Sequence, residues 1–163
     1  MGFYIIIRGP LGCGKSTVAK KISRILKSEY ISFDKILEEN GLDKKDNDFT
    51  AEDFIKADEI ILPQVKKSLS EGKCVVFDGC FFFKEQINHL KRNLKHIAYI
   101  FNLKASLQTC ISRDKKRKKT YGEKAAREVY ALVSRCDCGI GIDTEGKTAD
   151  YVVKKIISSL PSR

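Results

Sequence analysis

The residues whose types and spacing carry the clearest chemistry form one stretch, Gly9-Pro10-Leu11-Gly12-Cys13-Gly14-Lys15-Ser16. It fits the phosphate-binding pattern G-x-x-x-x-G-K-S/T at every fixed position. Glycines let the backbone curl so that successive N–H groups point at phosphate oxygens, and the helix expected after the loop presents its positive N-terminal end to the same anion. The stretch therefore predicts a site for the phosphates of a nucleoside triphosphate.

Lys15 and Ser16 are the chemically active members of this stretch. Lys15 is expected to lie along the β- and γ-phosphates, and Ser16 to place its hydroxyl on Mg²⁺. ATP and Mg²⁺ are accordingly the expected cofactors. The other residues expected at the nucleotide from this region are Gly9, Gly12, Cys13, Gly14 and Thr17.

The segments on either side of the loop must hold it in place. Residues 3–8 form a β-branched run short enough for a buried parallel strand, and Val18, Ile22, Ile25 and Leu26 follow the loop at helical spacing. Strand, glycine loop and helix in this order are what the motif requires.

Two carboxylates follow predicted strands. Asp34 ends a short strand at Tyr30–Phe33 and is a candidate for the group that accepts the proton of an attacking hydroxyl, since ligands of open α/β sheets bind beyond the carboxyl ends of strands. It equally fits an N-cap for the helix that follows. Asp78 ends a strand at Cys74–Asp78, where a Walker B carboxylate reaches Mg²⁺, although Asp-Gly also makes a plain turn.

In nucleotide kinases the segment between the second and third strands houses the acceptor site, and residues 34–70 have that place in this chain. A polar loop spans Asn40 to Asp48, and Thr50 with Asp53 opens a helix that runs to about Leu69. After Asp78, the three aromatic residues 81–83 could line an acceptor pocket, but at least two are expected in the core.

A basic stretch at residues 113–122 is the candidate lid. Six of its first seven residues are basic, and Arg113 and Arg117 would share one face if the preceding helix continues. Guanidinium groups there could clamp the phosphates and stabilise the transferred group. A solvated charge run and a nuclear-localisation-like patch are the alternatives.

The remaining segments alternate between helices and strands. Helices are expected at 84–94, 106–113, 123–134 and 149–160, and strands at 96–102 and 139–143. Five strands separated by helices favour an α/β fold with a parallel sheet. His89 and His96 have no acid or cysteine at triad or ligand spacing and are expected at the surface or at a strand end.

Length and composition limit the remaining classes. The 163 residues fit a single domain, and the net charge of +10, from 31 Lys plus Arg against 21 Asp plus Glu, suits nucleotides and permits nucleic acid as a partner. Arg8 interrupts the N-terminal apolar run, so we expect no signal peptide, no membrane span and a cytoplasmic location. All six cysteines are expected to be reduced, and zinc binding by Cys136 and Cys138 is disfavoured because one intervening residue is too few.

Together, these motifs resemble the P-loop kinases of the adenylate-kinase-like group, and most of all its small hydroxyl kinases, such as polynucleotide 5′-hydroxyl kinases and chloramphenicol phosphotransferases. The resemblance implies a three-layer fold with strand order 2-3-1-4-5, Asp34 as general base and lid arginines on the ATP phosphates. It also implies an adenine-binding edge in the loop from Thr144 to Lys147.

One departure from the group bears on the acceptor. Nucleoside monophosphate kinases have Asp-Gly-Phe-Pro-Arg after the third strand, whereas this chain has Asp-Gly-Cys-Phe-Phe and lacks the arginine that grips the acceptor phosphate. The sequence thus predicts ATP- and Mg²⁺-dependent phosphoryl transfer to a hydroxyl, on a small molecule or a nucleic-acid 5′ end. A nucleoside monophosphate kinase and a nucleic-acid-binding module with slow ATP hydrolysis are the alternatives.

Overall fold

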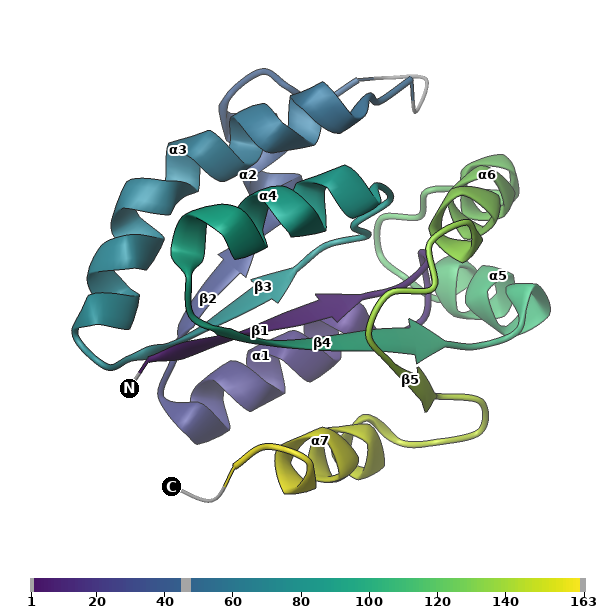
Figure 1. The fold of residues 1–163 in the computed structure, drawn as a ribbon. Coiled ribbons are helices and arrows are strands. Elements are labelled where there is room, and N and C mark those ends of the chain that lie inside the picture. Colours follow the sequence, from purple (N-terminus) through teal and green to yellow (C-terminus); the bar gives the residue numbers. More distant parts are fainter. Residues whose placement is uncertain (1, 45–47, 162–163) are drawn as a thin grey trace.

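The computed structural model describes residues 2–44 and 48–161. Within these ranges the chain alternates between strands and helices, as expected (Figure 1). In chain order, the elements are β1 (Phe3–Arg8), α1 (Lys15–Leu26), β2 (Glu29–Ser32), α2 (Phe33–Glu39), α3 (Ala51–Ser70), β3 (Cys74–Asp78), α4 (Lys84–Leu94), β4 (Ile97–Lys104), α5 (Leu107–Lys115), α6 (Glu123–Ser134), β5 (Ile140–Asp143) and α7 (Ala149–Ser158).

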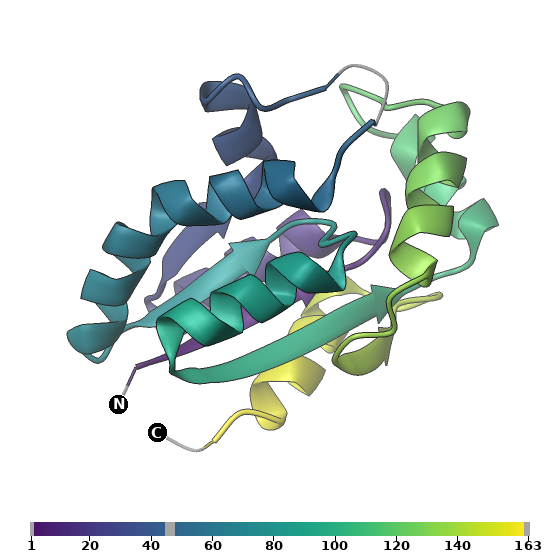
Figure 2. The ribbon, with the colours of Figure 1, turned by 45° about the horizontal axis from the view of Figure 1, so that its top comes forward.

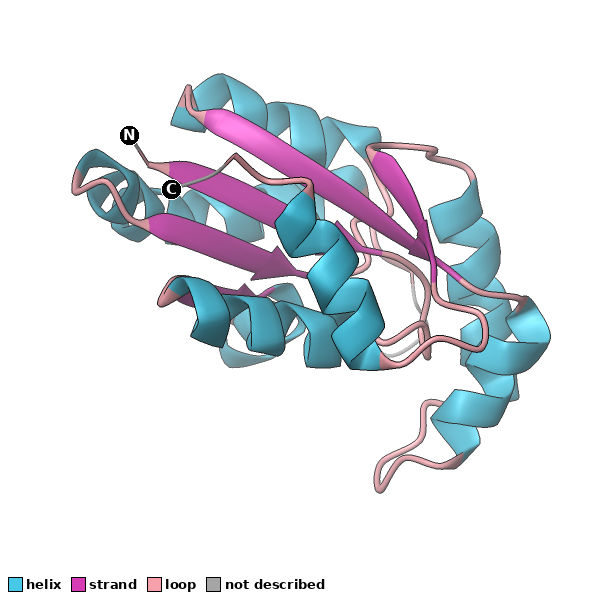
Figure 3. Cartoon of the chain, turned by 90° about the horizontal axis from the view of Figure 1, so that it is seen from below, coloured by secondary structure: helices cyan, strands magenta, loops and turns pink. Residues whose placement is uncertain are grey.

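The strands form one parallel sheet in the order β2-β3-β1-β4-β5, which confirms the predicted fold class and strand order. Helices α3 and α4 cover one face, and α1 and α7 cover the other (Figures 1 and 3). Figure 2 shows α2 and α3 on one side of the carboxyl ends of the strands and α5 and α6 on the other. The result is a three-layer structure. Helices from both halves of the chain flank the carboxyl ends of its strands.

The central strand β1 shows why its sequence is apolar throughout rather than alternating. Tyr4 and Ile6 belong to the core under α3 and α4, while Ile5 and Ile7 belong to the core over α1 and α7, and all four side chains have no exposed surface. A strand covered on both faces must bury every side chain. This burial anchors the phosphate-binding loop that follows.

The strand register brings the expected chemical groups to one edge of the sheet. Asp78 on β3 lies opposite Ile7 on β1 and opposite Ser32 on β2. Each of the three strands therefore ends at about the same level. The loop after β1, the start of α2 and the carboxylate that ends β3 are consequently neighbours.

The boundaries around Asp34 differ from the prediction. Strand β2 ends at Ser32 instead of Phe33, and the Ser32 side chain accepts a hydrogen bond from the Lys35 backbone N–H at 3.5 Å. Ser32 is thus the N-cap, and Asp34 lies within the first turn of α2. The interpretation of Asp34 as an N-cap was wrong because the hydroxyl two residues earlier takes that position.

Other helix starts agree with the expected capping residues. The Thr50 backbone N–H donates to the Asp53 carboxylate at 2.8 Å in the capping box that opens α3. Ser106 caps α5 and Thr148 caps α7. Helix α5 extends to Lys115, two residues beyond its predicted end, and part of the loop predicted at 40–48 lies outside the described residues.

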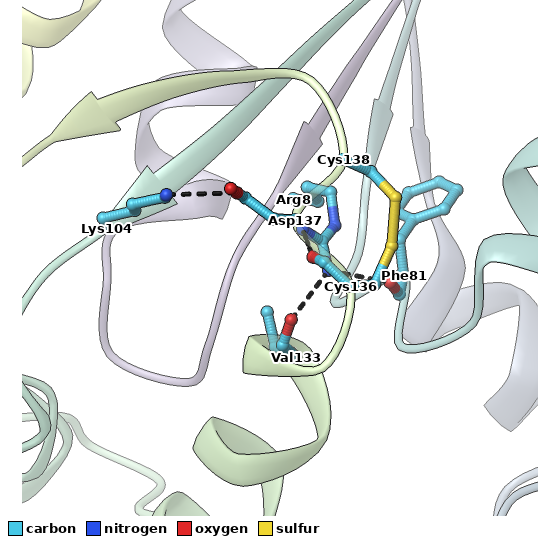
Figure 4. The surroundings of a disulfide bond; sticks show 7 residues. All are labelled: Arg8, Phe81, Lys104, Val133, Cys136, Asp137 and Cys138. Atoms are coloured by element: carbon cyan, nitrogen blue, oxygen red, sulfur yellow. Dashed lines mark hydrogen bonds and ion pairs between the residues drawn. A yellow bond between two sulfur atoms is a disulfide. The ribbon is translucent and has the colours of Figure 1, made fainter.

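The expectation that all six cysteines are reduced was wrong for one pair, because Cys136 and Cys138 form a disulfide (Figure 4). The buried Arg8 guanidinium donates to the carbonyls of Cys136 at 2.7 Å, Val133 at 3.1 Å and Phe81 at 3.2 Å. This turn holds the two cysteine Cα atoms 5.6 Å apart, within disulfide range, so the disfavoured zinc site is not formed by this pair. The other four cysteines are buried and form no disulfide in the described residues, as expected: Cys13, Cys74, Cys80 and Cys110.

His89 has an acidic partner in the structure, although no acid lies at triad or ligand spacing in the sequence. Its Nδ1 lies 2.9 Å from a carboxylate oxygen of Asp58, which is fully buried between α3 and α4. Gln86 donates to the other carboxylate oxygen of Asp58 at 3.1 Å. Burial raises the pKa of Asp58 to about 8, although the Gln86 hydrogen bond opposes this shift. The partner lies 31 residues earlier on another helix, so local spacing could not indicate it.

Candidate active site

The loop after β1 has the backbone conformation that its glycines permit. Gly14 has a φ of 96° and immediately precedes α1, which begins at Lys15. Gly12 has a φ of 78°, and a Cβ there would lie 2.2 Å from the Cys110 carbonyl oxygen on α5. Glycine at position 12 is therefore required both by conformation and by the close approach of α5.

Lys15 is held inside this loop. Its side chain is buried, and its Nζ donates to the carbonyl of Pro10 at 2.8 Å. Burial alone would lower the pKa of Lys15, but neighbouring acidic groups, including the carboxylates of Asp78 and Asp34, raise it above its ordinary value. The loop therefore holds a charged ammonium group close enough to both carboxylates to interact with them.

Asp78 is buried at the end of β3, and Tyr30 on β2 donates its hydroxyl hydrogen to Asp78 Oδ2 at 2.6 Å. Burial raises the pKa of the Tyr30 hydroxyl, and the hydrogen bond to the carboxylate raises it further. Tyr30 thus stays protonated and orients Asp78. Sequence inspection treated Tyr30 only as a strand residue, because the partner lies 48 positions later.

Asp34 is open to a cavity of about 320 Å³ at the carboxyl edge of the sheet, which we call the acceptor cavity. Surrounding protein atoms desolvate its carboxyl and raise its pKa above the ordinary value, while the nearby Lys15 ammonium opposes this rise. Asp34 thus lines the cavity and lies close enough to Lys15 for their charges to interact. The described residues that line the cavity are Leu11, Asp34, Leu37, Glu38, Asp43, Lys44, Phe49, Phe54, Cys80, Phe82, Lys119, Tyr121, Ala125 and Val129.

Aromatic side chains form one wall of the acceptor cavity. Phe82 packs against Phe54 with ring centroids 5.4 Å apart and against Phe49 with centroids 6.3 Å apart. The prediction that at least two of the residues 81–83 belong to the core is confirmed, since Phe81 and Phe82 are buried. Phe82 also lines the cavity, so burial and contact with the cavity coincide in one side chain.

A second, smaller cavity of about 200 Å³ lies on the α1 and α7 side of the loop. Here Arg113 donates to the Thr144 carbonyl at 2.8 Å and to the Thr144 hydroxyl at 3.1 Å. The structure thus brings together residues that were expected at the nucleotide but are far apart in the chain. Those lining this cavity are Cys13, Gly14, Thr17, Arg113, Thr144 and Lys147.

The two lid arginines do not share a helix face, because α5 ends at Lys115. Arg113 turns toward Thr144, whereas Arg117 lies 3.8 Å from Asp114 and 5.7 Å from the Tyr121 ring centre. Asp114, the one acid in the basic stretch, is buried and accepts hydrogen bonds from the backbone N–H groups of residues 121 and 122. Asp114 therefore fixes the turn in the basic stretch at residues 113–122. The surrounding basic residues gave no sign of this role in the sequence.

The fold and this site define a P-loop kinase, an enzyme class that transfers phosphoryl groups. A family model described as an AAA domain matches residues 5–132, and the chain belongs to this family of P-loop kinase domains. The match includes the glycine loop, both carboxylates and the lid segment.

Known proteins are similar over almost the whole chain. A Pyrococcus furiosus protein named "Putative adenylate kinase" is 30% identical over 166 residues, which cover 97% of this chain and 84% of that protein. A sugar kinase structure from Janibacter has a TM-score of 0.80 at 12% identity and covers 97% of this chain and 94% of its own. The Mycobacterium tuberculosis APS kinase in complex with AMPPNP and APS has a TM-score of 0.70 at 16% identity, with 96% of each chain covered. Both structural similarities concern the fold alone.

None of the helices in the described ranges is both long and apolar enough to cross a lipid bilayer.

Proposed function

We propose that this P-loop kinase transfers the γ-phosphoryl group of ATP to a hydroxyl group of a molecule bound in the acceptor cavity. The observation that carries the proposal is the position of Asp34, which lines this cavity and lies close enough to Lys15 for their charges to interact. A general base for hydroxyl phosphorylation must lie between the acceptor and the phosphates.

In the proposed reaction, the acceptor oxygen forms a bond to the γ-phosphorus while the bond between that phosphorus and the bridging oxygen of ADP breaks. The hydroxyl proton passes to Asp34, and the electron pair of the broken bond stays with ADP. Desolvation by surrounding protein atoms raises the pKa of Asp34, which makes it a stronger base than an ordinary aspartate. The loop N–H groups and Lys15 stabilise the charge of the phosphates.

Ser16 and Asp78 are proposed to hold Mg²⁺. A hydroxyl and a carboxylate are the oxygen donors that this ion prefers, and Ser16 lies in the first turn of α1. No three His, Cys, Asp or Glu side chains gather as a metal-ligand set in residues 2–44 and 48–161, but this site needs only two protein ligands because phosphates and water complete the shell. Bound Mg²⁺ would neutralise phosphate charge.

The remaining site residues receive roles from their positions. Arg113 and Arg117 are proposed to stabilise the transferred phosphoryl group, and Thr144 with Lys147 to contact the nucleoside. In this proposal residues 1–163 act as one kinase domain. Residues 113–122 form its lid, and residues 34–70 form its acceptor side.

A nucleoside monophosphate kinase is the second candidate, favoured by the name of the Pyrococcus furiosus relative. Such an enzyme would also bind its acceptor in the cavity beside Asp34. Transfer from ATP to AMP or CMP in a coupled assay would identify it.

The proposed function is tested by transfer of labelled γ-phosphate from ATP to nucleosides, nucleoside monophosphates, 5′-hydroxyl oligonucleotides and small alcohols. Lys15→Ala should lower transfer by about 10³-fold or more, because it removes the charge that stabilises the β- and γ-phosphates. Lys66→Ala, an exposed change on α3, is the matched control and should leave transfer unchanged. A folded Lys15→Ala protein that retains transfer would contradict the proposal.

A further inference from the structure

The lining of the acceptor cavity is mostly apolar. Phe49, Phe54 and Phe82 supply aromatic surface, and leucine, alanine and valine side chains complete the walls. The buried Cys80 side chain also lines the cavity. A ligand in contact with these walls is stabilised through apolar area rather than through charge.

The charged groups of the acceptor cavity are unsuited to an anion. Three carboxylates line it, Asp34, Glu38 and Asp43, against the two ammonium groups of Lys44 and Lys119. The Lys44 ammonium is already paired with Asp53 at 2.7 Å, and Lys119 is exposed. Among the groups that line the cavity, an anionic ligand would therefore meet more carboxylates than unpaired ammonium groups.

None of the described residues that line the cavity is an arginine. Arginine presents the planar pair of N–H donors that matches phosphate and carboxylate oxygens. Arg113 is bonded to Thr144 and lines the smaller cavity, while Arg117 lies near Asp114 and the Tyr121 ring. The described lining of the cavity therefore offers no guanidinium group to an acceptor phosphate.

We propose that the acceptor is an uncharged hydroxyl compound of about nucleoside size whose flat ring packs against Phe82 and Phe49. The proposal rests on the proposed function, since it names the molecule that receives the phosphoryl group. The cavity of about 320 Å³ is at the lower end of the range for small-molecule sites, in agreement with a ligand of one or two rings.

The test compares acceptors in matched pairs that differ by one anionic group. Adenosine is paired with AMP, cytidine with CMP, and 2-phenylethanol with 3-phenyllactate, each with γ-labelled ATP and the full chain. For at least one pair, kcat/KM for the uncharged member should exceed that for its anionic partner by about tenfold or more. A 5′-hydroxyl oligonucleotide, anionic beyond its first nucleoside, should likewise be a poorer acceptor than the free nucleoside.

Two charge-reversal variants on α2 distinguish the effect of charge at the cavity lining from the effect of charge elsewhere on the surface. Glu38→Lys places a cation at the cavity lining and should improve transfer to the anionic member of each pair. The ratio of kcat/KM for the uncharged member to that for the anionic member should therefore fall about five- to tenfold. Glu39→Lys makes the same change at the next residue, which is exposed and pairs with Lys35, and should leave the preference unchanged.

The outcomes distinguish this proposal from the proposed function. Preference for AMP, CMP, phenyllactate or the oligonucleotide would overturn the acceptor class while leaving phosphoryl transfer intact. Absence of transfer to every uncharged member by a protein that binds ATP would also overturn it. A protein that binds ATP no better than Lys15→Ala would instead contradict the proposed function and, with it, this inference.

Discussion

At the phosphate-binding loop, the residues expected at the nucleotide follow one another from Gly12 to Thr17, whereas the acceptor cavity draws its lining from segments as far apart as Leu11 and Val129. The loop is built by backbone conformation within a few residues, as the φ angles of Gly12 and Gly14 show. The cavity is built by packing between α2, α3 and α6. A local motif thus specifies where phosphates bind, and tertiary structure specifies what else binds.

Asp34 lines the acceptor cavity and interacts with Lys15 of the loop. Its replacement should therefore have the largest effect on turnover. Asp34→Asn should lower turnover by about 10² to 10⁴-fold with little change in ATP affinity, because it removes the proton acceptor and keeps the shape. In the native enzyme, turnover should fall at low pH through a pKa above that of an ordinary aspartate, since protonation removes the base. Steady-state kinetics and ATP titration measure both effects.

Glu39→Gln is the matched control for this change. It removes an exposed carboxylate from the same helix, and its turnover should equal that of the native enzyme. Equal turnover in Asp34→Asn and Glu39→Gln would mean that Asp34 is not the proton acceptor.

Tyr30 tests whether the phosphate edge also depends on distant residues. Tyr30→Phe removes the hydroxyl that donates to Asp78 and should raise the Mg²⁺ concentration needed for half-maximal activity by about tenfold, the equivalent of one hydrogen bond to a charged group. Tyr99→Phe, on β4 with its ring against Phe3, should leave this requirement unchanged. An unchanged Mg²⁺ requirement in Tyr30→Phe would show that the loop alone positions the metal.

Asp58 offers the smallest and most specific test, because it joins α3, which carries Phe54, to α4, which follows Phe82 and Phe83. Its pKa of about 8 lies above the value in the unfolded chain, so the folded protein binds more protons between about pH 4 and 8. The free energy of unfolding should therefore fall as pH rises through this window, with a contribution of at most about 1.4 kcal/mol per pH unit. Asp58→Asn should remove this contribution.

Urea unfolding at a series of pH values measures this dependence. Glu52→Gln, which removes an exposed carboxylate from the first turn of α3, should keep the native slope. A slope that persists unchanged in Asp58→Asn would assign the pH dependence to other groups.

Most of the fold was predictable from the sequence, because buried strands and amphipathic helices leave short-range patterns. Strand β3 and helices α4 and α6 have their predicted bounds, and the resemblance to P-loop kinases supplied the strand order. The error at Asp34 has a local cause. Ser32 displaced Asp34 as the N-cap through a choice between two neighbouring polar residues, which local preference alone does not resolve.

In the candidate site, local patterns indicated the contiguous loop, the carboxylates after strands and Arg113, and the resemblance added the loop from Thr144 to Lys147. Tyr30 beside Asp78 and Asp58 beside His89 are contacts between elements far apart in the chain, and neither residue of such a pair signals the other. The disulfide between Cys136 and Cys138 depends on a turn held by Arg8, whose role appears only after folding. Long-range polar contacts therefore set the limit of inference from one sequence.

We propose above all that the loop from Gly9 to Ser16 encloses the β- and γ-phosphates of ATP. A crystal structure with Mg²⁺ and a non-hydrolysable ATP analogue tests it most directly. In such a crystal, Lys15 should leave the Pro10 carbonyl and contact the phosphates, and the terminal phosphate of the analogue should be directed at Asp34. An analogue bound elsewhere, with Lys15 still bonded to Pro10, would contradict it.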